Sequence, residues 1–146
     1  MDDENTSSTN ITSTIEDYLE RVLFLSEKKG FAKVTEIAND LNISKASVTE
    51  MISKLKNQGF VDFEKYGTIT LTNEGKKIAS KIKDRHILLE SFLKLIGVCP
   101  ETASKDCCVM EHDLSKETIT SLKNFISFLE EPEQRDISER FKRYLK

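Results

Sequence analysis

The stretch KVTEIANDLNISKASVTEMISKLKNQG, residues 33–59, restricts the possible folds more than any other part of the chain. Apolar side chains recur every three or four residues in its two halves, which predicts two short helices capped by Thr35 and Ser44. Asn42-Ile43 predicts a tight turn between them, and Gly59 ends the second helix. Two short helices that cross over such a turn are typical of a helix-turn-helix.

After Gly59 the apolar period changes from helical to alternating, which predicts two strands, Phe60–Phe63 and Thr68–Leu71, joined by a short turn. A further helical pattern over residues 14–29 precedes the helix-turn-helix. Three helices followed directly by a hairpin predict a winged helix. Its third helix, residues 44–58, would then lie in the major groove of DNA.

The rest of the chain carries helical patterns. Thr72 is placed to cap a long helix that runs to about Leu95, Pro100 and Ser115 mark the starts of two more helices, and a final amphipathic helix follows Pro132. We therefore expect a mainly α fold. It comprises a flexible N-terminal tail (1–13), a winged helix-turn-helix DNA-binding domain (14–75) and an all-helical domain (76–146).

Charge is distributed unevenly along the chain. Residues 28–85 contain 12 Lys+Arg and 7 Asp+Glu, a balance of +5, so the net charge of −3 leaves −8 for the remainder. A basic segment inside an acidic protein favours a nucleic-acid-binding domain attached to a second domain. No apolar run approaches the roughly 20 residues that span a bilayer. The polar N-terminus also lacks the features of a secretory signal, so we expect a cytoplasmic protein without a membrane partner.

Double-stranded DNA is the expected partner of the winged helix. The start of its third helix presents short polar and basic side chains that suit base edges, and lysines on neighbouring segments can contact phosphates. The predicted DNA-binding residues are Lys33, Thr35, Ser44, Lys45, Ala46, Ser47, Thr49, Lys54 and Lys65.

A second constellation lies in the helical half, in the stretch CCVMEH. Cys108, Glu111 and His112 stand at positions i, i+3 and i+4, so a helix places a thiol, a carboxylate and an imidazole on one face. Such a face makes a partial metal site. Cys107 is expected to point elsewhere on the helix and to be structural.

Two polar pairs elsewhere also have helical spacing: Asp17 with Glu20, and His86 with Glu90. Mixed oxygen, nitrogen and sulfur ligands suit first-row divalent ions from manganese to zinc, and do not suit calcium or magnesium. Each residue taken singly also has a purely structural interpretation. Both histidines of the chain, however, fall at positions that suit a ligand.

The thiols leave other functions open. Cys108 and His112 can in principle act as the nucleophile and base of an enzyme. The chain lacks a Gly-rich phosphate loop, a nucleophile elbow and a Rossmann turn, so we expect no enzyme. A metal-independent winged-helix regulator and a thiol-based redox sensor using Cys107 or Cys108 remain alternatives to a metal-dependent regulator.

The stretches IEDYLERV, RHILLESFLKLIGV and MEHDLS, and the segment from Phe31 to Ala79, resemble the diphtheria toxin repressor family of metal-dependent transcription regulators. The resemblance is collinear over residues 14–130 and is strongest to short, two-domain members without the SH3-like third domain. It implies a homodimeric repressor of metal-uptake genes, active when loaded with Mn²⁺ or Fe²⁺, with Co²⁺, Ni²⁺ and Zn²⁺ as further ions that can bind in vitro. The two recognition helices of the dimer would match the half-sites of a palindromic operator.

The resemblance also implies a ligand set. By position, the metal ligands of the family fall on Asp17, Glu20, His86, Cys108, Glu111 and His112, with Glu90 as a ligand of an ancillary site. A cysteine at 108 is typical of the iron branch, whereas the two acids of the first helix are typical of the manganese branch. Ser104 stands where the iron branch has an ancillary histidine. The apolar stripe Ile119, Leu122, Phe125 and Leu129 is a candidate part of the dimer interface.

Overall fold

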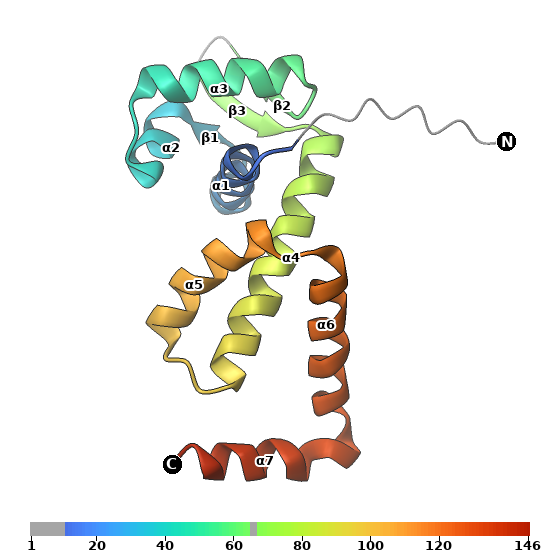
Figure 1. The fold of residues 1–146 in the computed structure, drawn as a ribbon. Helices are drawn as coiled ribbons and strands as arrows, with labels where there is room; N and C mark the ends of the chain where they lie inside the picture. The colour runs from blue at the N-terminus through green and yellow to red at the C-terminus, as the bar shows by residue number, and fades with distance from the viewer. Residues whose placement is uncertain (1–10, 65–66) are drawn as a thin grey trace, which may run out of the picture. The chain divides into compact units, whose positions relative to one another are not determined.

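The computed structural model describes residues 11–64 and 67–146. These residues form seven α-helices, a 3-10 turn and three short strands, a mainly helical fold as expected (Figure 1). The chain divides into two compact units, and the boundary between Lys81 and Ile82 falls inside the long helix α4. The first ten residues of the expected tail and the predicted DNA contact Lys65 lie outside the described residues.

The first unit is the winged helix. Its elements are α1 (Ser13–Lys29), β1 (Ala32–Lys33), α2 (Val34–Leu41), α3 (Lys45–Asn57), β2 (Val61–Phe63), β3 (Thr68–Leu71) and the start of α4 (Asn73–Leu95). The strands form an antiparallel sheet in the order β1-β3-β2, so β2 and β3 are the expected hairpin. The sequence did not predict β1, because two residues are too short to show an alternating pattern; Ala32 pairs with Ile69 of the hairpin.

The apolar face of each element in this unit points into one core. Leu19, Val22, Ile37, Val48 and Ile69 are all completely buried there. Because these side chains come from α1, α2, α3 and β3, the core fixes the orientation of α3 relative to the hairpin. The recognition helix is therefore held by packing on one side and free to present its other side to solvent.

Helix caps explain where the helices of this unit begin. Ser44 caps α3 as expected, since its Oγ accepts a hydrogen bond from the backbone N–H of Ser47 at 3.0 Å. The sequence favours Ser13 or Thr14 as the cap of α1, but Thr12 has this role. The expectation for Thr35 was also wrong, because α2 already begins at Val34.

The start of α2 is stabilised by Glu36. Its carboxylate accepts a hydrogen bond from the backbone N–H of Lys33 at 3.0 Å and pairs with the ammonium of Lys29. A carboxylate in the first turn also interacts favourably with the helix dipole. The hydrogen bond to the Lys29 side chain, with the charges of Lys29 and Lys33, holds the pKa of Glu36 below its usual range.

This lowered pKa predicts a pH-dependent effect of Glu36→Gln. The stabilisation by ionised Glu36 is fully present above the pKa of the carboxyl group in the unfolded chain and is lost as the pH falls through its lower pKa in the folded state. The variant should therefore be modestly less stable than the wild type at pH 7, with a gap that closes under acidic conditions. Urea unfolding at a series of pH values measures this, and a gap that widens on acidification would contradict it.

Gly75, in the first turn of α4, is required by a close backbone contact. A Cβ at this position would lie 2.0 Å from the carbonyl oxygen of Phe60 and 2.9 Å from its carbonyl carbon. Thr72 brings the two segments together, since its Oγ1 donates to the Gly59 carbonyl at 2.7 Å and accepts from the Gly75 N–H at 3.1 Å. The start of α4 is thus anchored to residues 59–60, which link α3 to β2.

We expect Gly75→Ala to destabilise the first unit by about 1–3 kcal/mol, because the backbone must shift to admit the methyl group. Helix propensity alone predicts the opposite, a gain of roughly 1 kcal/mol. Ser80→Ala, at an exposed position of the same helix, is the matched control and should be close to neutral. The denaturant concentration at the midpoint of unfolding measures this effect. A midpoint for Gly75→Ala at or above that of the wild type would show that the close contact with Phe60 does not require glycine at this position.

The second unit is helical. It contains the rest of α4, followed by α5 (Pro100–Asp113), α6 (Lys116–Glu130), η1 (Pro132–Gln134) and α7 (Arg135–Tyr144). Its core is small, with Leu89, Leu93, Ala103 and Cys107 buried. None of the helices described is long and apolar enough to cross a membrane.

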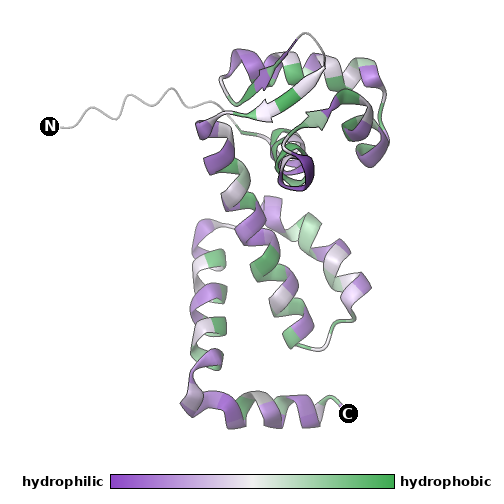
Figure 2. Cartoon of the chain, turned by 180° about the vertical axis from the view of Figure 1, so that it is seen from behind, coloured by the Kyte–Doolittle hydropathy of each residue, from purple (hydrophilic) through white to green (hydrophobic). Residues whose placement is uncertain are grey.

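Apolar side chains of α6 and α7 are left accessible in this single chain. Figure 2 shows apolar and polar residues alternating along both helices, and α6 has no buried residue. An apolar cavity of about 210 Å³ lies between the C-terminal end of α4 and the helices α6 and α7, and it is lined by Leu95, Ile96, Phe125, Leu129, Ile137 and Phe141. Apolar side chains gathered at one surface suit contact with another protein surface.

Candidate metal centre

Helices α4 and α5 of the second unit bring three of the predicted ligands together. The Nδ1 atom of His86 lies 3.0 Å from Oε2 of Glu111, across 25 residues of sequence. The other carboxylate oxygen of Glu111, Oε1, lies 3.6 Å from Nε2 of His112. A single carboxylate therefore stands between the two histidines of the chain.

The burial of Glu111 is the feature that most needs a physical cause. Its side chain is 1% exposed, and it is the one buried charged residue within the part of the chain that the structure describes. Burying an ionised carboxylate is costly unless it is paired or coordinates a metal ion. A carboxylate flanked by two imidazoles fits a divalent transition metal, because all three groups are ordinary ligands of such ions.

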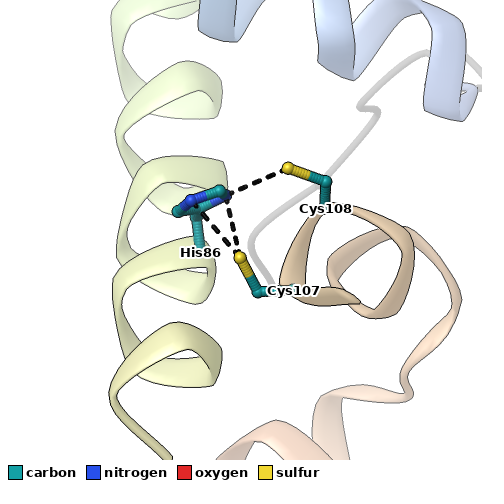
Figure 3. A group of neighbouring side chains, drawn as sticks. All are labelled: His86, Cys107 and Cys108. Atoms are coloured by element: carbon teal, nitrogen blue, oxygen red, sulfur yellow. Dashed lines mark hydrogen bonds between the residues drawn. The ribbon is translucent and has the colours of Figure 1, made fainter. Parts of the chain in front are cut away.

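Both cysteines of α5 lie against the same histidine (Figure 3). The sulfur of Cys107 is 3.4 Å from Nε2 of His86 and 3.7 Å from Nδ1, and the sulfur of Cys108 is 3.9 Å from Nδ1. The expectation that Cys107 points elsewhere was therefore wrong. Cys107 is completely buried and Cys108 is exposed, yet both face His86.

The two thiols share a backbone acceptor as well. Each sulfur donates to the carbonyl oxygen of Ser104, at 3.3 Å from Cys107 and 3.2 Å from Cys108. Burial, followed by the electrostatic influence of Cys108, Glu111 and Glu90, raises the pKa of the Cys107 thiol to about 12. This thiol therefore stays protonated near neutral pH, and an ion that binds it must displace the proton.

The remaining predicted ligands lie apart from this cluster or in the other unit. Glu90 forms an ion pair with Lys94 at 2.9 Å, and the hydrogen bond from that lysine holds the pKa of the Glu90 carboxyl below its usual range. Asp17 and Glu20 both lie on α1 of the first unit, Asp17 exposed and Glu20 half-buried. Their contribution to a metal site with residues of the second unit stays a prediction.

The predicted DNA contacts lie on the solvent side of the winged helix. Ser44, Ala46, Ser47 and Thr49 are exposed at the start of α3, while the buried Val48 holds that turn against the core. The other predicted contacts that the structure describes are also exposed: Lys33, Thr35, Lys45 and Lys54. Contact with DNA stays a prediction for each of them.

Two family models match almost the whole chain. Residues 10–69 match the N-terminal DNA-binding domain of the iron dependent repressor, and residues 72–138 match its metal-binding and dimerisation domain. The chain belongs to the iron dependent repressor family. This membership confirms the resemblance to the diphtheria toxin repressor family that the sequence motifs indicated.

Named members of the family share a large part of their sequence with this chain. The HTH-type transcriptional regulator MntR of Geobacillus kaustophilus is 40% identical over 124 residues, which cover 85% of this chain and 88% of that protein. MntR of Bacillus subtilis is also 40% identical over 124 residues, 85% of this chain and 87% of that protein. The match therefore extends through both units.

Solved structures of the family have the same fold. The IdeR structure of T. acidophilum superposes with a TM-score of 0.71 at 26% identity, and covers 77% of this chain and 53% of that chain. A manganese-dependent transcriptional repressor in complex with manganese has a TM-score of 0.71 at 29% identity, covering 77% of this chain and 52% of that one. This chain thus spans about half the length of these two proteins.

Membership in the iron dependent repressor family establishes the class of function. The chain is a metal-dependent, DNA-binding transcriptional regulator with a dimerisation domain. Members are regulators and not enzymes, which confirms the expectation drawn from the absence of catalytic motifs. The cofactor is a divalent transition metal, and the winged helix is the part that binds DNA.

Proposed function

We propose that this chain is a homodimeric cytoplasmic repressor that binds a palindromic operator when loaded with Mn²⁺ or Fe²⁺ and controls genes for metal uptake. The observation that carries the proposal is the buried carboxylate of Glu111 between His86 and His112, within a family of metal-dependent regulators. Burial of a carboxylate is costly, and coordination of a metal ion offsets that cost.

The proposed ligand set takes donors from both units. His86 of α4 and Cys108, Glu111 and His112 of α5 supply two imidazoles, a carboxylate and a thiol, and Asp17 and Glu20 of α1 supply two further carboxylates. When bound, the ion supplies positive charge that compensates for these anionic donors. The carboxylates suit Mn²⁺, whereas the thiol moves the preference toward softer ions.

This set would couple metal loading to DNA binding. Asp17 and Glu20 belong to the unit that carries the recognition helix α3, and the other donors belong to the unit that carries the dimerisation domain. Donors that share one ion restrict the freedom of their two units, and so set the separation of the two α3 helices in a dimer. A fixed separation matches two half-sites about one helical turn apart. By linkage, DNA must then tighten metal binding by the same factor.

The dimer contact is proposed for the apolar side chains that the single chain leaves accessible on α6. Phe125 is 47% exposed and Phe128 is 42% exposed, whereas Ile119 and Leu122 of the predicted stripe pack against the core of the second unit. The N-terminal half of the stripe would therefore pack in the core of the second unit, and its C-terminal half would contact the other subunit of the dimer.

A redox sensor remains a second candidate because two thiols lie close together. The raised pKa of Cys107 argues against it, since the reactive form of a thiol is the thiolate. A Cys108→Ser variant separates the two. If the chain is a metal regulator only, peroxide does not change DNA binding by the wild type or by Cys108→Ser. If it is a redox sensor, peroxide changes DNA binding by the wild type, and the variant loses this response.

The experiment that tests the proposed function is selection of DNA from a randomised duplex pool in the presence and absence of Mn²⁺ or Fe²⁺. We expect enrichment of an inverted repeat in the metal-loaded arms, with half-sites spaced by about one turn of DNA. Enrichment of the same sequences without metal would contradict metal dependence. A single unrepeated site would contradict the palindromic operator.

A further inference from the structure

Cys107 has no part in the proposed ligand set, yet its sulfur occupies a position that a ligand would take. Successive residues of a helix point about 100° apart, so adjacent cysteines seldom face one side chain. Here both sulfurs face one imidazole, at 3.7 Å and 3.9 Å from Nδ1 of His86. One donor atom from each of His86, Cys107 and Cys108 lies within 4.8 Å of the other two.

These separations match the edges of a tetrahedral metal site. Metal–nitrogen bonds of about 2.0–2.1 Å and metal–sulfur bonds of about 2.3 Å place tetrahedral nitrogen and sulfur ligands about 3.5 Å apart. The observed distances from Nδ1 of His86 are 3.7 Å to the sulfur of Cys107 and 3.9 Å to the sulfur of Cys108. The carboxylate of Glu111, 3.0 Å from Nδ1, is the nearest donor for a fourth position.

We propose that His86, Cys107 and Cys108 form a second coordination set, which selects thiophilic divalent ions such as Cd²⁺ or Zn²⁺. Two sulfur ligands and one imidazole favour softer ions over Mn²⁺. Each thiol gives up its proton to solvent as the sulfur–metal bond forms, so two protons are released for each ion bound. This set shares His86 and Cys108 with the ligands of the proposed function. Competition between thiophilic ions and Mn²⁺ therefore rests on the proposed function. Binding of a thiophilic ion to His86, Cys107 and Cys108 does not rest on it.

The alternative is that Cys107 is only a small apolar residue of the core. Its neighbours Leu89, Leu93 and Ala103 are indeed buried with it. This alternative explains the burial of Cys107, but it leaves unexplained why the sulfur lies only 3.4 Å from Nε2 of the half-buried His86. The two interpretations differ in one number, the count of thiolates bound to a soft ion.

Cadmium titration of the full chain counts those thiolates, because each sulfur–cadmium bond adds ultraviolet charge-transfer absorption. We expect the wild type to show the absorption of two thiolates at one equivalent of Cd²⁺, and Cys107→Ala about half of it. The same variant should lower the affinity for Cd²⁺ relative to that for Mn²⁺ by about tenfold or more. Cys99→Ala, which removes the third and exposed cysteine, is the matched control and should leave the absorption unchanged.

Cys108→Ala keeps the test decisive if replacement of the buried Cys107 disturbs folding. Cys108 is exposed, so its loss should be tolerated. Half of the wild-type absorption in this variant means that Cys107 binds the ion, whereas complete loss would overturn the proposal. Full wild-type absorption in Cys107→Ala would overturn it equally. Because the titration contains no DNA, its result does not depend on whether the proposed function is correct.

Discussion

Glu111→Gln should abolish the metal response. We expect the affinity for Mn²⁺ to fall by about 100-fold or more, since the substitution removes the negative charge at the centre of the cluster while keeping the shape of the side chain. Glu111 lies between two imidazoles and is almost completely buried, so no other carboxylate of α5 can take its place. Calorimetric titration of the metal-free protein with Mn²⁺ measures the loss directly.

The matched control for this prediction is Glu101→Gln. It makes the same chemical change on the same helix, but at an exposed position in the first turn of α5. We expect this control to bind Mn²⁺ as the wild type does. Glu111→Gln should also remain folded, because an amide retains hydrogen-bonding capacity next to His86. Equal Mn²⁺ affinities in the two variants would remove Glu111 from the site.

Ala46→Glu should abolish DNA binding without destabilising the protein. Ala46 is exposed in the first turn of α3, two residues after the cap Ser44. A carboxylate there interacts favourably with the positive end of the helix dipole, a gain of about 0.3–1 kcal/mol. Against DNA the same charge meets phosphates of like sign, which costs several kcal/mol. We expect a loss of operator affinity of more than about 100-fold.

The neutral variant Ala46→Gln separates charge from size. Its side chain is nearly identical in volume to that of glutamate, so a loss caused by repulsion should be much smaller in Ala46→Gln. Thermal unfolding of both variants is the second readout, and we expect Ala46→Glu to be at least as stable as the wild type. DNA binding by Ala46→Glu at the wild-type level would show that α3 does not enter the groove.

The elements of the winged helix could be predicted because their signals are local. Ser44 and Ser115 cap helices as expected, and β3 has the predicted bounds Thr68–Leu71. The errors also have local causes. Thr35 was a reasonable cap by residue type, but the hydrogen bond from the Lys33 backbone to Glu36 begins α2 two residues earlier than a cap at Thr35 would place it. Competing polar residues near a helix start cannot be ranked by spacing alone.

The neighbours of His86 could not be predicted because they depend on how α4 and α5 pack. Helical spacing groups Cys108 with Glu111 and His112, but it groups Cys107 with Glu111 equally well, at i and i+4. The buried Ala103, four residues before Cys107, carries the signal that was missed. Ala103, Cys107 and Glu111 form the stripe of α5 that is buried, and this stripe decides which sulfur approaches the ring most closely.

The central claim is that metal binding switches DNA binding, and fluorescence anisotropy on a selected operator duplex tests it most directly. The affinity of the chain for that duplex is measured once with saturating Mn²⁺ and once after metal removal with a chelator, at one fixed salt concentration because salt alone changes such affinities. We predict that Mn²⁺ raises the affinity by about 5–150-fold, the usual range of allosteric coupling. Equal affinities in the two conditions would contradict the account.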